Sequence, residues 1–321
     1  MKIVMLDRMG TDFSLENKIF RAEGATFIVT YFKDADDLIS LTHDADVLMF
    51  NDAQITEEII AGLDKCKMII RYGIGFDNVD LAAAGKKGIY VCNAPSYGTY
   101  DVAEHTMALL LSVCKHIPIA DKCARTGKWN AENVGKVRRL SGKTLGLVGF
   151  GRIARFVAAR AKAFEMDLLV YDPFANEADV VASGATPSSL ETLLKNADYV
   201  TLHAPLTEET RHMIGMTQFK LMKQDAVLIN TGRGGLVNEK ELIFALLSGE
   251  IGGAALDVFE EEPLPADSKL LTMENVVLTP HVAWNSYEGV VDLHKEVTDN
   301  VVRVLHGEKP INIVNQKYLR K

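Results

Sequence analysis

The stretch KTLGLVGFGRIARFVAARAKAFEMDLLVYDP, residues 143–173, decides the fold of this chain. An apolar run leads into the turn Gly149-Phe150-Gly151, a helical pattern of apolar residues follows, and a second apolar run ends at Asp172. This order of strand, glycine turn, helix, strand and acid is the one that a dinucleotide-binding βαβ unit requires. The stretch therefore predicts a dinucleotide site.

The special residues of this turn each have a physical reason. Gly149 permits the sharp turn, Gly151 lets the backbone approach a pyrophosphate, and Ala154 is small enough for the helix to pack on the strand. The diphosphate would lie at the N-terminus of the helix that starts near Arg152, where unpaired N–H groups and the helix dipole favour an anion. Asp172 stands where a carboxylate can accept a hydrogen bond from a ribose 2′-hydroxyl.

Length and composition indicate an ordinary globular protein of two domains. The chain has 321 residues, of which 48% are hydrophobic and 24% are charged. A net charge of −8 argues against a nucleic-acid surface. No apolar run approaches the roughly 20 residues that span a bilayer, and we expect no membrane contact.

The cysteines indicate a reducing compartment. The four are scattered without the pairing typical of metal sites: Cys66, Cys92, Cys114 and Cys123. We therefore expect free thiols, no bound metal and a cytoplasmic location. The N-terminal MKIVMLDR meets an acid too early for a signal peptide and is better interpreted as a first strand.

Strands alternate with helices on both sides of the glycine motif. The expected strands are residues 2–6, 26–31, 47–50, 68–71 and 89–92 before it, and 199–202, 227–230, 254–257 and 276–278 after it. Such alternation predicts parallel sheets with helical crossovers. Two of the expected helices are 238–247, ending at Gly249, and 286–305.

Residues 101–117 are apolar nearly all round, which predicts a helix buried against its own domain or against a partner subunit. Residues 118–143 are typical of a connecting arm. Together these segments would expose more apolar surface than a monomer leaves in water, so we expect a homodimer.

Three further patterns follow expected strands, and they carry groups that could do chemistry. They are NTGRGG at 230–235, LDVFEEEP at 256–263 and TPHVAW at 279–284. Ligands of open α/β sheets bind at the carboxyl ends of strands. Arg233 offers a planar fork to a carboxylate, and His281 offers an acid–base group. Spacing alone does not indicate which of the three glutamates, Glu260, Glu261 or Glu262, takes part in the chemistry.

These motifs, in this order and approximate spacing, resemble the D-isomer-specific 2-hydroxyacid dehydrogenases. RYGIGFDNVDLAA and NAPSYGTYDVAEHTMALLL are similar to that family's substrate loop and linking helix. The resemblance runs from about Arg71 to Trp284, while residues 1–65 match only as a generic α/β layer. Within the family, the motifs look most like the C-terminal-binding-protein-related and phosphoglycerate dehydrogenase-like group.

The resemblance implies three catalytic residues. Arg233 holds the substrate carboxylate and polarises the carbonyl, and His281 is the acid–base group. The glutamate directly before the proline, Glu262, is the partner that orients the imidazole and favours its charged form.

The resemblance also implies binding residues, with NAD as the cofactor. Backbone amides of Ile74 and Gly75 would hold the substrate carboxylate, and Tyr97 and Trp284 would form aromatic walls unless both rings simply pack in a core. The implied cofactor contacts are Thr106, Gly149, Gly151, Arg152, Ile153, Asp172, His203, Ala204, Pro205, Thr210, Thr231, Gly232 and Asp257, the last near the nicotinamide amide.

The expected fold is α/β, with two doubly wound parallel-sheet domains and a cleft between them. A flavodoxin-like substrate domain comprises residues 1–98 and 289–321, and a Rossmann NAD-binding domain comprises residues 99–288. The expected reaction is NAD-dependent interconversion of a 2-keto acid and a D-2-hydroxy acid. Hydroxypyruvate or glyoxylate is the first candidate for the keto acid. The alternatives are 3-phosphoglycerate oxidation and, from another class, a corepressor-like protein that binds NAD as a sensor.

Overall fold

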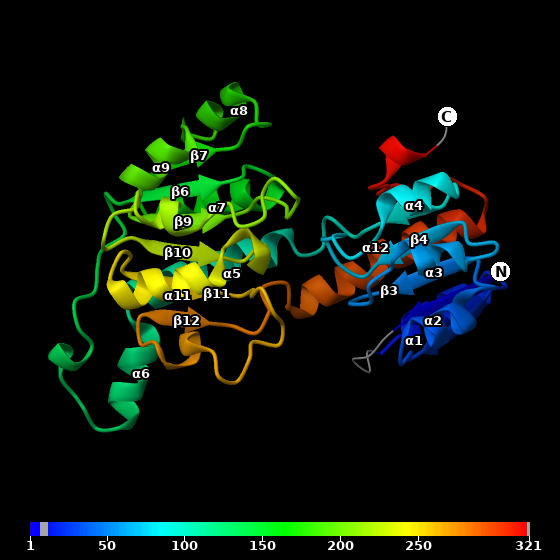
Figure 1. Ribbon diagram of the computed structural model, residues 1–321, viewed down its shortest axis with the longest axis horizontal. Helices are drawn as coiled ribbons and strands as arrows, with labels where there is room; N and C mark the ends of the chain where they lie inside the picture. The colour runs from blue at the N-terminus through cyan, green and yellow to red at the C-terminus, as the bar shows by residue number, and fades with distance from the viewer. Residues whose placement is uncertain (7–11, 320–321) are drawn as a thin grey trace. The chain divides into compact units, whose positions relative to one another are not determined.

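The computed structural model describes residues 1–6 and 12–319, which form two α/β units (Figure 1). The first unit comprises Met1–Gly98 and Ser286–Lys321, and the second comprises Thr99–Asn285. The predicted second boundary, between residues 288 and 289, lies three residues farther along the chain.

The first unit is built on a five-stranded parallel sheet in the order β2-β1-β3-β4-β5. The strands in this order are Thr26–Thr30, Lys2–Leu6, Val47–Phe50, Met68–Arg71 and Tyr90–Cys92. This 2-1-3-4-5 order is the flavodoxin-like one, which confirms the predicted fold class for this unit.

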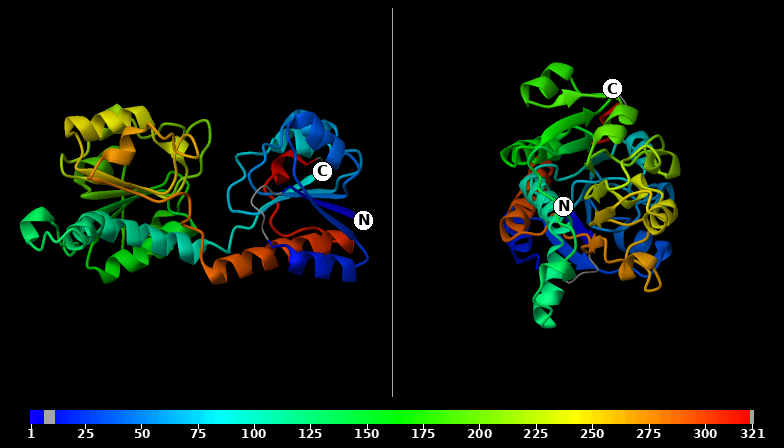
Figure 2. Two further views of the ribbon diagram at one scale, coloured as in Figure 1. Left: turned by 90° about the horizontal axis from the view of Figure 1, so that it is seen from below. Right: turned by 90° about the vertical axis from the view of Figure 1, so that its left-hand side faces the viewer.

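Helices cover both faces of this sheet (Figure 2). One face carries α2 (Ala35–Thr42), α3 (Glu57–Ala61) and α4 (Leu81–Lys86), whose apolar side chains share one core with the sheet. The other carries α1 (Ser14–Ala22) and α12 (Tyr287–Leu305), which contact each other.

The C-terminal tail completes the first unit by pairing with β5 and packing on α4. The Asn315 side chain accepts from the Val91 amide at 2.9 Å and donates to the Ile89 carbonyl at 2.9 Å. A Cβ at Gly85 would come within 2.4–2.7 Å of Tyr318 in η4 (Gln316–Tyr318), so α4 needs glycine there. Residues far apart in sequence therefore close one edge of this unit.

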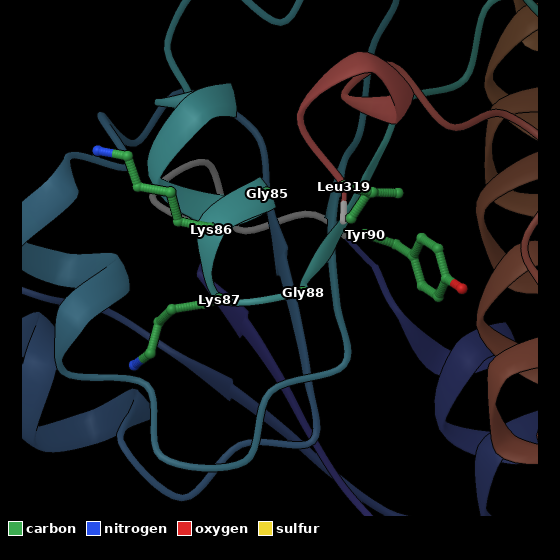
Figure 3. A pocket seen from close by; sticks show the side chains of 6 residues that line it. All are labelled: Gly85, Lys86, Lys87, Gly88, Tyr90 and Leu319. Carbon is green, nitrogen blue, oxygen red and sulfur yellow. The ribbon is translucent and has the colours of Figure 1, made fainter. Parts of the chain in front are cut away.

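A shallow depression beside this tail has no converging polar groups (Figure 3). It is lined by Gly85, Lys86, Lys87, Gly88, Tyr90 and Leu319, and the two lysine side chains point away from Tyr90 and Leu319. Lys87 Nζ donates to three carbonyls at the end of α3, those of Ile60, Ala61 and Leu63, at 2.7–3.0 Å. Its charge thus caps a helix, and we assign no ligand to this depression.

The second unit is built on a seven-stranded parallel sheet in the order β12-β11-β10-β9-β6-β7-β8. The strands in this order are Val276–Leu278, Gly253–Leu256, Val227–Asn230, Tyr199–Leu202, Thr144–Val148, Asp167–Tyr171 and Thr186–Pro187. Counted from β6, this is the Rossmann order 3-2-1-4-5-6 with one more strand, as predicted. The order reverses between β6 and β9, which is where such sheets bind ligands.

Two cores lie on the two faces of the second sheet (Figure 2). The first is covered by α5 (Thr99–Cys114), α7 (Arg152–Ala163) and α8 (Glu177–Ala182). The second is covered by α9 (Leu190–Asn196), α10 (Met216–Phe219) and α11 (Glu239–Ser248). The remaining short helical turns are η1 (Ala131–Asn133), η2 (Gly234–Leu236) and η3 (Lys269–Thr272).

The apolar helix α5 buries most of its surface within its own unit, against α7, β10, β11 and β12. It therefore does not offer the exposed apolar face on which we based the expected homodimer, and that part of the argument is wrong. The arm that follows is not irregular throughout either, because it contains α6 (Ile117–Arg125), which extends from the body of the unit (Figure 1).

All four cysteines are buried free thiols, as predicted. Burial raises the pKa of Cys66 and of Cys92 to about 12, so both stay protonated and unreactive. Among the helices of residues 1–6 and 12–319, none is long and apolar enough to cross a membrane.

Candidate active site

The glycine turn after β6 and the loop after β9 meet at the point where the strand order reverses. Gly149 has a φ of +91°, and a Cβ there would come within 2.7 Å of the Ala204 nitrogen. Only glycine fits because of both its backbone conformation and this close approach. The His203 amide donates to the Val148 carbonyl at 2.7 Å, which fixes the second loop beside the turn.

The N-terminus of α7 is left open for an anion. Gly151 is its N-cap, no side chain caps the helix, and its first turn contains no acidic residue. A Cβ at Gly151 would meet no atom within 4 Å, so there is space in front of the helix. Arg152 and Ile153 are its first two residues. An uncapped twelve-residue helix with free space at its N-terminus fits the diphosphate of a dinucleotide.

Asp172, directly after β7, holds the glycine turn, and its contact with a ribose stays a prediction. Its Oδ2 accepts from the Phe150 amide at 2.7 Å, and its Oδ1 accepts from the Phe174 amide at 2.8 Å. Each carboxylate oxygen can accept a second hydrogen bond, so the pair of amides leaves room for ribose hydroxyls.

We expect the protein to prefer NADH over NADPH by about a hundred-fold in kcat/KM. The negative charge of Asp172 would repel a 2′-phosphate, and like charges brought together cost several kcal/mol. Steady-state rates with the two reduced cofactors measure this preference. Asp172→Asn keeps an acceptor for the Phe150 amide but removes the charge, so it should reduce the preference for NADH over NADPH. Equal efficiency of the wild type with both cofactors would contradict the prediction.

Four more predicted cofactor residues lie in this unit, in the loop after β9. His203 Nε2 lies 3.1 Å from Thr201 Oγ1, and burial lowers the pKa of His203 to about 4, so its ring is neutral. Thr210 Oγ1 donates to the Pro205 carbonyl at 2.7 Å, which closes the turn that starts at Ala204. Their roles toward a cofactor stay predictions.

Thr106 on α5 and Thr231 after β10 contact each other directly. Their hydroxyl oxygens are 2.8 Å apart, and Thr106 Oγ1 also donates to the Val102 carbonyl at 2.7 Å. Both residues are buried. This contact ties the start of the arginine turn to α5.

The arginine turn is shaped by Asn230, which the sequence did not single out. Its side chain accepts from the Gly232 amide at 3.0 Å and donates to the Arg233 carbonyl at 2.9 Å. A Cβ at Gly234 would lie 1.8 Å from the Phe259 carbonyl oxygen, so glycine lets this turn lie directly against the loop after β11. Arg233 and the Glu262 loop are brought together by this approach.

His281, after β12, is fixed at three points. Its amide donates to the Asp257 carbonyl at 2.8 Å, its carbonyl accepts from Trp284 Nε1 at 3.0 Å, and its ring Nδ1 lies 2.6 Å from Glu262 Oε2. Its φ of +54° lies in the left-handed region, which non-glycine residues rarely adopt. Such a backbone persists only where surrounding bonds hold it, and it is typical of functional sites.

The structure separates the three glutamates by their partners. Glu262 Oε1 accepts from the Phe259 amide at 2.9 Å, while its Oε2 faces His281. Glu260 instead contacts His212 and accepts from the Glu239 amide at the start of α11 at 3.0 Å. Glu261 is exposed. The glutamate chosen from the resemblance is therefore the one that contacts the histidine.

The Glu262 carboxyl stays ionised throughout the neutral range. Burial raises its pKa, but hydrogen bonds from the His281 ring and the Phe259 amide outweigh it, with help from the charges of His281 and Arg233. The pKa therefore lies below its ordinary value. This carboxylate can hold Nδ1 protonated, which leaves Nε2 to exchange a proton with a substrate.

We expect Glu262→Gln to move the high-pH fall in the reductive rate to lower pH. Reduction needs a charged His281, and a neutral amide no longer stabilises that charge. The pH profile of NADH oxidation at saturating substrate measures the shift, and NADH affinity should stay nearly unchanged. The matched control is Glu261→Gln, which should leave the profile in place. An unmoved profile in the Glu262 variant would mean that the pair does not set the acid–base behaviour.

Asp257 is wholly buried at the end of β11 and is surrounded by donors from the histidine loop. Thr279 Oγ1 donates to its Oδ1 at 2.6 Å, and the amides of Val282 and Ala283 donate to its carboxylate at 2.9 Å each. Its predicted contact with the nicotinamide amide is untested. Its visible contacts are all internal, so its first task is to hold the loop of His281.

The residues predicted to bind substrate fall in both units. Ile74 and Gly75 lie in the loop after β4 of the first unit, where the Ile74 carbonyl accepts from Asn93 Nδ2 at 2.6 Å and the Gly75 carbonyl accepts from Arg71 Nη1 at 2.8 Å. A trans peptide points its N–H opposite to its C=O. The amides in the same peptides as these carbonyls, those of Gly75 and Phe76, thus point away from Asn93 and Arg71. Contact of the Ile74 and Gly75 amides with a substrate carboxylate stays a prediction.

The two predicted aromatic walls differ in their surroundings. Tyr97 is buried in the first unit, and its amide donates to Glu296 Oε2 at 3.2 Å. Trp284 is half-buried in the second unit, and its indole N–H is used by the His281 carbonyl. Contact of either ring with a substrate stays a prediction.

Comparison with known proteins identifies the family. The model for the NAD-binding domain of D-isomer specific 2-hydroxyacid dehydrogenases matches residues 107–283. A D-3-phosphoglycerate dehydrogenase of Methanocaldococcus jannaschii is 43% identical over 282 residues, covering 87% of this chain and 53% of that protein. A glyoxylate reductase of Korarchaeum cryptofilum is 41% identical over 296 residues, covering 91% of this chain and 86% of that protein.

A solved structure agrees with the fold. D-lactate dehydrogenase from Aquifex aeolicus, complexed with NAD and lactic acid, superposes with a TM-score of 0.86 at 30% identity, covering 95% of this chain and 96% of that one. The chain thus spans about half the length of the phosphoglycerate dehydrogenase that it matches, and most of the length of the other two proteins. It belongs to the D-isomer-specific 2-hydroxyacid dehydrogenase family, whose members are NAD-dependent oxidoreductases.

Proposed function

We propose that this protein reduces a small 2-keto acid to a D-2-hydroxy acid with NADH, reversibly, and that glyoxylate or hydroxypyruvate is the substrate. The observation that carries the proposal is the pair of His281 Nδ1 and Glu262 Oε2 at 2.6 Å beside the Arg233 turn. Such a pair supplies a charged imidazole with a fixed orientation, next to a cation suited to a carboxylate.

The residues divide the work as follows. Arg233 binds the substrate carboxylate and draws electron density from the neighbouring carbonyl. When NADH is bound, it supplies two electrons and one hydrogen to the carbonyl carbon. His281 Nε2 gives a proton to the carbonyl oxygen, so that keto acid, NADH and one proton yield hydroxy acid and NAD⁺. Glu262 keeps the ring oriented while its charge changes.

An unphosphorylated substrate is favoured by how Arg71 is used. This cation stands next to the Gly73–Gly75 loop, and its guanidinium donates to the carbonyls of Asn51 at 2.9 Å and Gly75 at 2.8 Å. A guanidinium that already orders the loop is less available for a phosphate. The 43% identity to a D-3-phosphoglycerate dehydrogenase supports that substrate as the second candidate.

A panel of keto acids tests the proposal. NADH oxidation should be fastest with glyoxylate or hydroxypyruvate, slower with pyruvate, and slowest with 3-phosphohydroxypyruvate. A preference for the phosphorylated acid would replace the first candidate with the second. NADH binding without oxidation of NADH by any acid would contradict an enzyme and support a protein that senses NAD.

The proposal includes a homodimer in the cytoplasm. The arm from 118 to 143 exposes large apolar side chains that a partner subunit would cover, since Trp129 is 84% exposed and Val137 is 48% exposed. Light scattering at micromolar protein should give twice 35.3 kDa. A mass near that of one chain would contradict the dimer.

The four reduced, buried cysteines support a reducing compartment.

A further inference from the structure

A side chain outside the proposed catalytic residues touches the support of the histidine loop. His105 lies on α5, and its Nε2 is 3.0 Å from Thr279 Oγ1 and 3.6 Å from Asp257 Oδ1. Its side chain is 23% exposed, while that of Asp257 is fully buried. The contact spans 174 residues of sequence, so it joins two elements that the fold brings together.

The direction of the hydrogen bonds follows from what each group can do. An ionised carboxylate only accepts, so the single hydroxyl proton of Thr279 goes to Asp257. The Thr279 oxygen can then only accept from the ring, so His105 Nε2 must carry a proton. The chain of donors therefore runs from His105 to Thr279 to Asp257, and each bond polarises the next.

This chain ends on the residue that sets the His281 backbone. Asp257 accepts at its side chain from Thr279, Val282 and Ala283, and at its carbonyl from the His281 amide. The loop thus encloses one buried aspartate, and His281 takes its left-handed conformation inside this enclosure. A strained conformation of this kind persists only where several surrounding bonds hold it.

Two consecutive residues of α5 reach the two loops that carry proposed catalytic groups. His105 contacts Thr279 in the histidine loop, and Thr106 contacts Thr231 in the arginine turn at 2.8 Å. The helix is buried against the same sheet, so it is a rigid support for both contacts.

We propose that His105 is a positioning residue: through Thr279 and Asp257 it holds the loop of 279–284, and so sets the orientation of His281. The proposal rests on the acid–base function proposed for His281. Small errors in the placement of such a group are costly, because a shift of about 1 Å can reduce turnover by about a hundred-fold.

Kinetics of full-length variants provide the first test. His105→Leu and Thr279→Val each interrupt the series of hydrogen bonds from His105 to Asp257. Each should lower kcat by about ten-fold, with NADH affinity nearly unchanged. The double variant should be no slower than the slower single variant, because both changes interrupt the same series of hydrogen bonds. His105→Gln, which keeps a donor at a similar reach, and Thr279→Ser should retain most of the turnover. Losses that multiply in the double variant, or full activity of His105→Leu, would overturn the proposal.

A spectroscopic readout does not depend on activity. The chain has two tryptophans, and Trp129→Phe leaves Trp284, whose indole N–H bonds the His281 carbonyl, as the reporter of the loop. In this background, His105→Leu and Thr279→Val should both increase quenching of Trp284 by acrylamide, and His105→Gln should not. A matched control is His43→Leu in the first unit, where an exposed ring also bonds a carbonyl, and it should change nothing.

The two failures can be told apart. Reduced turnover of His105→Leu with unchanged Trp284 fluorescence would mean that His105 acts elsewhere than on the loop, which overturns the inference alone. Full activity of His281→Ala would overturn the proposed acid–base function, while the fluorescence would still report whether His105 holds the loop.

Discussion

His281→Ala should lower turnover by about a hundred-fold or more in both directions of the reaction. A positioned acid–base group contributes about 10²–10⁴-fold, and microscopic reversibility requires the same group for reduction and oxidation. The loss corresponds to about 2.7 kcal/mol or more of transition-state stabilisation. Steady-state rates of NADH oxidation with glyoxylate, and of NAD⁺ reduction with the hydroxy acid, measure both directions.

The control for this variant is NADH affinity, which should stay within about two-fold of wild type, since no cofactor contact is assigned to the ring. His212→Ala is a matched histidine variant in the same unit, where the ring contacts Glu260 instead of Glu262. It should retain nearly full turnover. A His281 variant that loses activity in only one direction would contradict a shared acid–base group.

Much of the fold follows from local sequence signals that agree with the tertiary structure. The helix expected at 238–247 is α11, with Asn238 as N-cap and Gly249 at a φ of +72° as its end. Ser286 likewise caps α12 by accepting from the Gly289 amide at 2.7 Å. Capping and helix-ending residues act within one turn of the chain, so they can be read without the rest of the molecule.

The elements that were missed have weak local signals. α6 is short and begins after His116, which has a φ of +53°, and the sequence around it is polar and rich in charge. β8 has only two residues and is an edge strand on β7. Neither contains a periodic apolar run long enough to distinguish it from a loop.

The proposed catalytic residues could be predicted as a set because of sheet topology. Arg233, Glu262 and His281 follow β10, β11 and β12, which are adjacent in the sheet. Parallel strands end at the same edge, so groups just past three neighbouring strands lie close together. Their positions along the sequence, at intervals of 29 and 19 residues, already contain this information.

The support of these residues could not be predicted in the same way. His105 and Thr279 are 174 residues apart, and neither stands in a pattern that marks a donor or acceptor. The role of Asp257 as the centre of the histidine loop depends on the backbone amides of residues 281–283. Every residue other than proline carries such an amide. Contacts made by backbone groups leave no trace in side-chain identity.

Arg233→Lys should lower kcat/KM by about a hundred-fold even though it keeps the positive charge. The guanidinium is planar and offers five donors in a fixed fork, so it can hold a carboxylate with two parallel bonds while Nη1 also donates to the Gly232 carbonyl at 2.8 Å. An ammonium is a point charge with free rotation, and it cannot keep both contacts. A lost hydrogen bond to a charged group costs about 1.5–3 kcal/mol, which is about 10–100-fold in rate.

The kinetic split separates binding from chemistry in this variant. If Arg233 only held the carboxylate, KM for the keto acid would rise and kcat would stay. Because the same fork also polarises the carbonyl that gains charge during reduction, we expect kcat to fall as well. Arg155→Lys is the matched control, since its guanidinium contacts Asp179 at 3.2 Å on the surface of the same unit, and it should leave both constants unchanged. An Arg233→Lys enzyme with wild-type kcat at saturating keto acid would mean that the arginine binds the substrate equally well before and during the reaction.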